Sequence, residues 1–273
     1  MKLRIVKGAW IGRLLQALGV NSVPAVGFYG EGWSIGTTLS LYWIETVLVT
    51  ILVAARIVLH RRWTRKAGHW DVPVEIEATG GGRTTVLHRR TTYLAAFLSV
   101  MIPFTAGHGL FLGAIILLVL PELTGAPADV SLLDLNDGAK AIALFLVLGL
   151  AFDLVGLGHR SFQWIERVAD RARGRMFLTH LTIVFGMGAM MIWEAPAALF
   201  GLFVGLKTLT DLGSVLPERA PSLDPPRWLA WLDRVGTNKK GDTFAAHYRK
   251  SVERDRRAQE AKERVLGPGD EVA

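Results

Sequence analysis

The hydrophobic residues of this chain gather in long segments, rather than in the short alternating runs that are typical of half-buried strands. The longest segment, residues 92–120, contains no Lys, Arg, Asp or Glu over 29 positions. At about 1.5 Å of rise per residue, a helix of that length exceeds the roughly 30 Å hydrocarbon layer of a bilayer. The segment therefore predicts a transmembrane helix.

Five further segments have the same apolar character with a few polar residues each. Four of them carry one or two ionisable residues, whereas the first is diluted by Arg13, Gln16 and Asn21 and interrupted by Pro24. Together with residues 92–120 they predict an all-α fold, a polytopic membrane bundle of six transmembrane helices. The five segments are 10–28, 33–59, 138–157, 176–193 and 196–213.

The N-terminus begins with the basic residues Lys2, Arg4 and Lys7, as a cleaved signal peptide would. However, Gln16 and Asn21 break its apolar stretch, and no small-x-small cleavage site precedes a soluble domain. A first helix that stays in the membrane is therefore the better interpretation.

The positions of the basic residues predict the orientation of the bundle. Of 31 Lys and Arg, 28 lie in the first 13 residues, in two connections (60–91 and 158–175) and in the tail from residue 214. The alternate connections carry acids and no Lys or Arg. Because basic loops stay in the cytoplasm, this alternation predicts a bacterial inner-membrane protein with both termini cytoplasmic. The acidic connections are 29–32, 121–137 and 194–195.

The composition excludes several classes of function. No cysteine is present, so a disulfide scaffold, a thiol nucleophile and a thiolate metal site are ruled out. The 51% hydrophobic content excludes a disordered chain. The net charge of +7 could indicate a nucleic-acid partner, but the orientation signal accounts for it. The expected partner is therefore the lipid bilayer, and no nucleic acid is expected.

Two segments are predicted to lie on the cytoplasmic side of the six-helix domain, residues 1–214. In the 60–91 connection, two alternating stretches flank Thr79-Gly80-Gly81-Gly82, which predicts a small β-hairpin. The tail, 215–273, contains a tryptophan-bearing stripe at 227–235 suited to the headgroup interface, and a highly charged helix at 242–265. The hairpin or the tail could dock a cytoplasmic partner. The alternatives are a folded-back loop without a partner and a solvated or partly disordered tail helix.

Polar residues within the predicted spans are the candidates for function, because ionisable groups in hydrocarbon are costly. They concentrate between the middle of the membrane and its cytoplasmic face. Glu45 and His108 lie near the middle of their spans, whereas Asp153, His180, Lys207 and Asp211 lie nearer the inner ends. The candidates are Tyr42, Glu45, His108, Asp153, His180, Lys207 and Asp211.

Three chemistries suit these residues, and the sequence leaves all three open. Carboxylates and histidines could form a substrate or proton site for transport or proton-coupled chemistry. Glu45, His108 and His180 could bind zinc or iron as an intramembrane metal-dependent enzyme, although no HExxH motif is present. Alternatively, Lys207 could pair with Glu45, or with Asp211 at i+4, in a structural or assembly protein without a site. Whether the protein is an enzyme therefore stays open.

Several short motifs resemble an uncharacterised family of bacterial multi-pass membrane proteins, defined as a domain of unknown function. The resemblance covers about residues 10–214 and not the tail, and it implies the same six-helix fold without implying an activity. Relatives typically carry Asn where this chain has Thr46, and many carry a His shortly after the residue that matches Asp211. The motifs are Leu41-Tyr42-Trp43-Ile44-Glu45, Gly107-His108-Gly109-Leu110-Phe111, Gly158-His159-Arg160-Ser161-Phe162, His180-Leu181-Thr182-Ile183-Val184-Phe185-Gly186 and Leu206-Lys207-Thr208-Leu209-Thr210-Asp211-Leu212.

Overall fold

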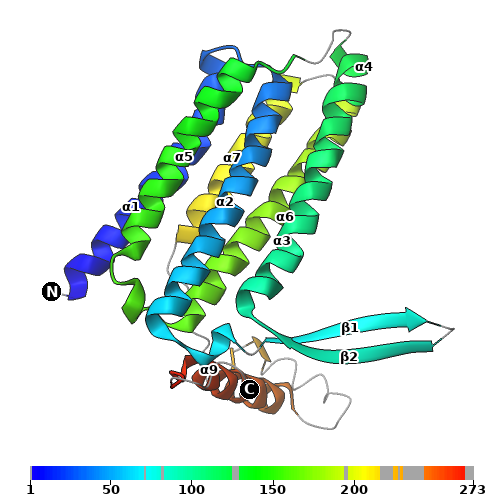
Figure 1. The fold of residues 1–273 in the computed structure, drawn as a ribbon. Helices are drawn as coiled ribbons and strands as arrows, with labels where there is room; N and C mark the ends of the chain where they lie inside the picture. The colour runs from blue at the N-terminus through cyan, green and yellow to red at the C-terminus, as the bar shows by residue number, and fades with distance from the viewer. Residues whose placement is uncertain are drawn as a thin grey trace.

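Long helices dominate the computed structural model and run side by side as a bundle (Figure 1). The structure describes residues 2–70, 72–80, 83–124, 129–193, 196–215, 224–226, 228–229 and 243–267. Each of the six predicted spans corresponds to one long helix. These are α1 (Lys2–Gly30), α2 (Ile35–Thr64), α3 (Tyr93–Ala114), α5 (Leu132–Leu154), α6 (Phe162–Trp193) and α7 (Pro196–Val215).

The starts of three helices are set by hydroxyl side chains. Ser34, Thr92 and Ser131 each adopt an extended backbone conformation and accept a hydrogen bond from the backbone N–H three residues on. Such caps satisfy an N–H group that has no partner inside the helix. They fix where α2, α3 and α5 begin.

Two helices contain features that the hydrophobic pattern did not predict. α1 continues through Pro24, which therefore does not interrupt it. Membrane helices tolerate such a proline because neighbouring groups satisfy the freed carbonyl. α3 continues into a π-helical turn, η2 (Ile115–Val119), and then into α4 (Leu120–Thr124). The predicted span 92–120 is thus one helical rod with a local change of winding.

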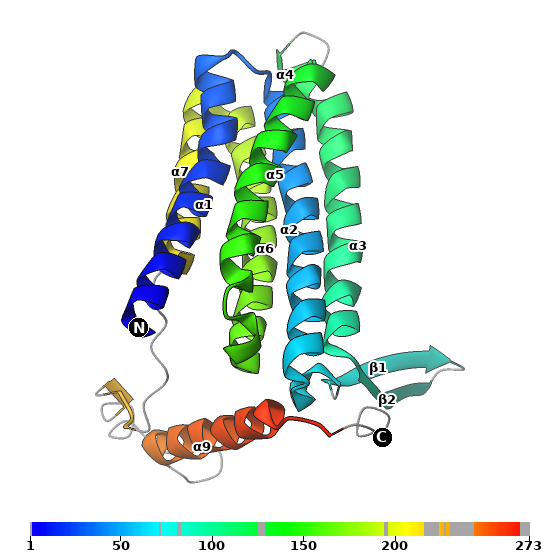
Figure 2. The same cartoon turned by 60° about the vertical axis from the view of Figure 1, so that its left-hand side comes forward.

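A second layer lies across one end of the bundle, which we call the basal end (Figure 2). It contains η1 (Ala67–His69), η3 (Leu157–His159), α9 (Phe244–Glu263), and the strands β1 (Val72–Gly80) and β2 (Arg83–Thr91). β1 and β2 pair antiparallel, with Val72 opposite Thr91 and Gly80 opposite Arg83. Residues 81–82, where the hairpin turn was predicted, lie outside the described residues. So do residues 194–195, and all of 227–235 except Trp228 and Leu229.

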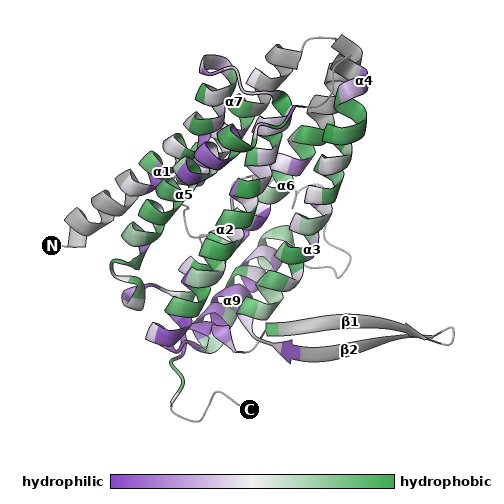
Figure 3. Cartoon of the chain, turned by 45° about the horizontal axis from the view of Figure 1, so that its top comes forward, coloured by the Kyte–Doolittle hydropathy of each residue, from purple (hydrophilic) through white to green (hydrophobic). Residues whose placement is uncertain are grey.

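Most of the described residues of the bundle helices are hydrophobic, whereas α9 is mostly hydrophilic (Figure 3). Among the described residues, three helices are long and apolar enough to cross a membrane: Ile35–Thr64, Tyr93–Glu122 and Leu132–Leu154. Large side chains such as Leu110, Leu117 and Leu133 are at least 70% exposed. An exposed apolar surface of this kind is typical of a protein whose solvent is lipid.

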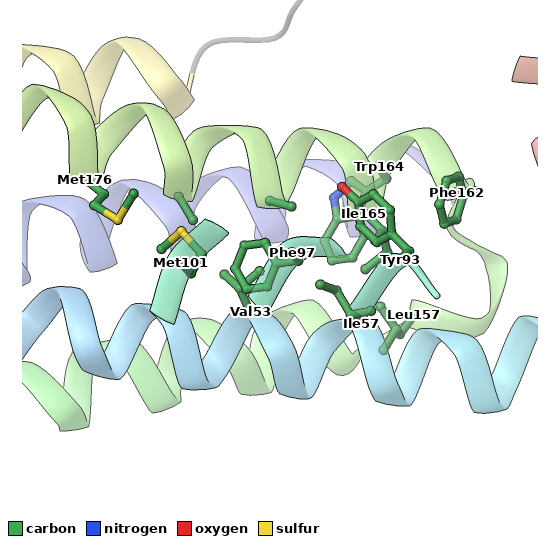
Figure 4. Close-up of a cluster of buried hydrophobic side chains, with 12 residues drawn as sticks. Val53, Ile57, Tyr93, Phe97, Met101, Leu157, Phe162, Trp164, Ile165 and Met176 are labelled. Carbon is green, nitrogen blue, oxygen red and sulfur yellow. The ribbon is translucent and has the colours of Figure 1, made fainter. Parts of the chain in front are cut away.

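The largest buried cluster lies between α2, α3 and α6 toward the basal end (Figure 4). Phe97, Met101 and Ile57 are fully buried there, and Phe162 packs edge-on against Tyr93. This packing fixes α6 against α2 and so positions the charged side chains of α6 described below.

Candidate functional site

Four charged side chains and one amide meet in the interior of the bundle, where α1, α2, α6 and α7 face one another. Lys207 Nζ lies 3.1 Å from Glu45 Oε1 and 3.1 Å from Asp211 Oδ2. Arg175 pairs with Glu45, and its Nη2 lies 2.9 Å from Asp211 Oδ2. Asn21 donates to Asp211 at 2.7 Å and accepts from Lys207 at 2.8 Å. We call these five residues the central charge cluster.

Most of the central charge cluster is buried. Glu45, Lys207 and Asp211 are only 2%, 3% and 6% exposed. Two acids and two bases balance in charge, as buried ions must because an unpaired buried charge is strongly unfavourable. The ring of Tyr42 lies 5.3 Å from Lys207 Nζ, in cation–π contact. The structure therefore brings together four of the candidates from the sequence.

Asp153, another candidate, belongs to a second ionic group nearer the basal end. Its Oδ1 lies 3.2 Å from Arg13 Nη2, and its Oδ2 lies 3.0 Å from Arg56 Nε. Arg56 is buried and also donates to the carbonyl of Leu52. One carboxylate shared by two guanidinium groups leaves this group with an excess positive charge.

A cavity of about 430 Å³ lies between the two ionic groups. Four arginines and two aspartates contribute to its wall, and most other lining residues are apolar, such as Val20, Leu52 and Leu146. The charged lining therefore has two more bases than acids. We call it the arginine cavity. Its charged lining residues are Arg13, Arg56, Arg171, Arg175, Asp153 and Asp211.

The two candidate histidines meet each other elsewhere in the bundle. His108 Nδ1 on α3 lies 2.8 Å from His180 Nδ1 on α6, so one ring donates to the other. The rings of Phe104 and Phe111 pack against His180. His108 is 4% exposed, and its Nε2 has no hydrogen-bond partner within the described part of the chain.

The predicted metal ligands are not assembled as one set. His108 and His180 are adjacent, but Glu45 is engaged in the central charge cluster. No group of three His, Asp or Glu side chains able to hold a metal ion occurs in the described ranges. The two histidines therefore form a hydrogen-bonded cross-link between α3 and α6.

A further buried histidine pair lies at the basal end, outside the predicted spans. His60 Nε2 contacts the carbonyl of Arg160 at 3.1 Å, so this nitrogen carries the hydrogen. A neutral His60 then accepts through Nδ1 from His69 Nε2, 2.8 Å away. Burial lowers the pKa of His69 to about 3, and the positive groups Arg61 and Lys66 add to the effect.

The arginines of the site and Asn21 were not among the candidates that the sequence predicted. Arg175 and Arg171 were counted among the bases of the 158–175 connection, because the apolar segment begins at Met176. α6 begins at Phe162, so both arginines lie on a helix inside the bundle. Arg171 and Arg175 are spaced i,i+4 and therefore lie on one face of α6. A predicted helix that began before Met176 would have included both arginines and shown this spacing.

One known family has a model that matches most of the chain. The model of a family of unknown function, DUF6498, matches residues 12–259. The match extends into α9, beyond residue 214, where the motif resemblance was expected to end. No curated protein and no solved structure matches the chain. Both ionic groups, most of α1 and α9, and the helices between them thus fall within one family match, and the chain belongs to the DUF6498 family.

Proposed function

We propose that this protein is a multi-pass membrane protein that binds an anionic ligand in the arginine cavity and moves it across the membrane. The observation that carries the proposal is the composition of the cavity wall, with four arginines against two aspartates. Guanidinium groups present donors in a planar fork that matches carboxylate and phosphate oxygens. Asp153 supplies one negative charge for the two positive charges of Arg13 and Arg56, and a bound anion would neutralise the remaining positive charge.

The place of the cavity in the bundle supports this function. Arg13, Arg56 and Asp153 lie toward the basal end, which the basic connections predict to be cytoplasmic. The central charge cluster forms the deeper wall through Arg175 and Asp211. An anion that enters from the cytoplasm would therefore meet a positive cavity that ends at a closed ionic barrier. Separation of those ion pairs would open the route, as in alternating access.

The second candidate is a structural or assembly protein whose buried charges only hold helices together. Its supporting observation is that each base of the central charge cluster already has two acidic partners. This candidate predicts that no anion changes the stability of the purified protein. The intramembrane enzyme has no comparable support, since Glu45 stands apart from the histidine pair.

Equilibrium binding of radiolabelled inorganic phosphate and sulfate to detergent-purified protein tests the proposal. We expect saturable binding that Arg171→Gln weakens about tenfold, because hydrogen bonds to charged groups contribute about 1.5–3 kcal/mol. Arg173→Gln is the matched control, since Arg173 lies two residues away on α6, pairs with Asp170 and does not line the cavity. Saturable binding lost equally in both variants, or no binding of either anion, would reject the proposed function.

A further inference from the structure

A second cavity adjoins the arginine cavity and has the opposite character. It has a volume of about 410 Å³ and lies between α1 and α5. Except for Gln16 and Ser22 its lining is apolar, and Leu15, Leu18 and Leu148 are each about half exposed on the outside of the bundle. We call it the apolar groove. Because that outer surface is apolar, the groove opens where acyl chains of the bilayer would lie.

One side chain, Gln16, lines both the arginine cavity and the apolar groove. It occupies space left by Gly149 on α5, since a Cβ atom there would collide with the Gln16 amide. Gln16 is therefore the one side chain that the linings of the two spaces share. On α1, Arg13, Ala17 and Val20 line the arginine cavity. The neighbouring face of α1 lies along the apolar groove.

The groove owes its concave shape to two further glycines of α1. Phe152 packs over Gly12 and Phe145 packs over Gly19, each at a distance that a Cβ atom would prevent. The aromatic rings approach the α1 backbone and leave room beside them for an apolar chain. A stripe of glycines alone would indicate close helix packing, but here two cavities with different chemistry flank it.

From this juxtaposition we infer that the anionic ligand is amphiphilic, with a phosphate-type head in the arginine cavity and an alkyl chain in the apolar groove. The inference rests on the proposed function and adds the substrate class. Charge complementarity selects the head, because Arg13 and Arg56 share Asp153 and so leave one positive charge at the cavity wall. The chain is selected by the apolar, outward-opening groove, which a small hydrophilic anion would leave empty. An anionic lipid or lipid precursor entering from the inner leaflet has this chemistry.

A chain-length series of soluble probes tests the inference on the full-length protein in detergent. Inorganic phosphate, butyl phosphate and hexyl phosphate share the head and differ in the chain, and hexanol supplies the chain without the head. We expect affinity to rise along the phosphate series by up to roughly fourfold for each methylene that the groove buries. Hexanol is expected to bind far more weakly than hexyl phosphate.

Variants on α5 separate the groove from the cavity. Leu148→Trp fills the groove and should remove most of the gain from the chain, while inorganic phosphate binds as before. Leu144→Trp is the matched control, because Leu144 is also exposed on α5 but lines neither space. If Leu148→Trp fails to fold, Ser22→Leu fills the groove from α1. Arg171→Gln should weaken all three phosphates.

The outcomes separate a failure of the amphiphilic ligand from a failure of the proposed function. If inorganic phosphate binds and hexyl phosphate binds no tighter, the ligand is a small soluble anion; the amphiphile is then rejected while the proposed function stands. Equal binding of hexanol and hexyl phosphate would reject the phosphate-type head. If neither inorganic phosphate nor sulfate binds, the proposed function itself fails, whatever the alkyl phosphates do.

Discussion

At the scale of single residues, Lys207 holds the central charge cluster together, since it contacts both carboxylates and Asn21. Lys207→Met should lower stability by about 3–5 kcal/mol, because it leaves two buried acids with one base, Arg175. Thermal unfolding in detergent measures the loss. Adding Glu45→Gln to Lys207→Met should restore part of it, because that change removes the uncompensated negative charge.

The control for Lys207 is a lysine in an exposed pair. Lys140 lies 3.4 Å from Asp137 at the start of α5, and both side chains are more than 60% exposed. Lys140→Met should therefore change stability by less than about 0.5 kcal/mol. Equal effects of Lys140→Met and Lys207→Met would show that the central charge cluster is solvated and not buried.

The histidine pair at the basal end makes stability depend on pH. Because the folded pKa of His69 is about 3 and the unfolded value is about 6.5, the unfolded chain binds more protons between these values. Stability from this residue is complete above pH 7 and falls with acidification, by about 2 kcal/mol at pH 5. His69→Gln should reduce the loss in thermal scans at pH 7 and pH 5, since the amide still donates to His60 but does not titrate.

His247→Gln provides the matched comparison for His69→Gln, because His247 lies exposed on α9. Its acid sensitivity should equal that of the unmodified protein. An unchanged pH dependence in His69→Gln would mean that other groups cause the acid destabilisation.

Individual residues also mark the limit of what the sequence could predict. The i,i+4 spacing of Lys207 and Asp211 was sufficient to predict their pairing. By contrast, the partners of Asp153 lie 140 and 97 positions away, and only the packing of α1 and α2 against α5 brings them close. The cavity could not be predicted for the same reason, since its wall combines residues of five helices.

At the scale of elements, the contacts of α9 are the feature that the sequence predicted least well. Its charged pattern correctly predicted a helix but favoured a solvated tail without contacts. In the structure the C-terminal end of α9 docks on the basal end of the bundle, where Lys66 and Val265 form a β-bridge and Lys262 pairs with Glu166. The sequence of a charged surface helix does not show which distant residues it contacts, because water and a neighbouring side chain can each satisfy its charges.

Glu263 fixes α9 to the bundle. One of its oxygens accepts from Lys66 Nζ at 2.6 Å, and the other accepts from the backbone N–H of Gln163 in the first turn of α6. Burial would raise the pKa of Glu263, but these hydrogen bonds outweigh it and the pKa lies below the usual value. Glu263→Gln should therefore loosen α9 and increase its amide hydrogen exchange by about tenfold.

The comparison for Glu263 is another glutamate of the same helix. Glu260 pairs within α9 with Arg256, and both side chains are more than 60% exposed. Hydrogen exchange of α9 in Glu260→Gln should match that of the unmodified protein. Fast exchange in all three proteins would contradict a docked α9.

At the scale of the whole molecule, the structure places the basic connections and the acidic segment around Asp129 at opposite ends of the bundle. The β strands, η1, η3 and α9 gather at the basal end, and the connections rich in Lys and Arg belong to that same end (Figures 1 and 2). The acidic segment around Asp129 lies at the opposite end, where its backbone accepts a hydrogen bond from Ser34. A bilayer between the two ends would explain both the exposed leucines and the sorting of charge.

The lack of cysteine in the chain makes this arrangement directly testable. A single cysteine at Asp129 or at Arg254, both exposed, introduces one thiol at a known end of the bundle. In intact bacterial cells, a membrane-impermeant maleimide should label Asp129→Cys and leave Arg254→Cys unlabelled until the membrane is broken. An Arg254→Cys protein labelled in intact cells, together with an unlabelled Asp129→Cys protein, would show that the bundle has the reverse orientation. The arginine cavity would then open outward, and the ligand would have to enter from the outer leaflet.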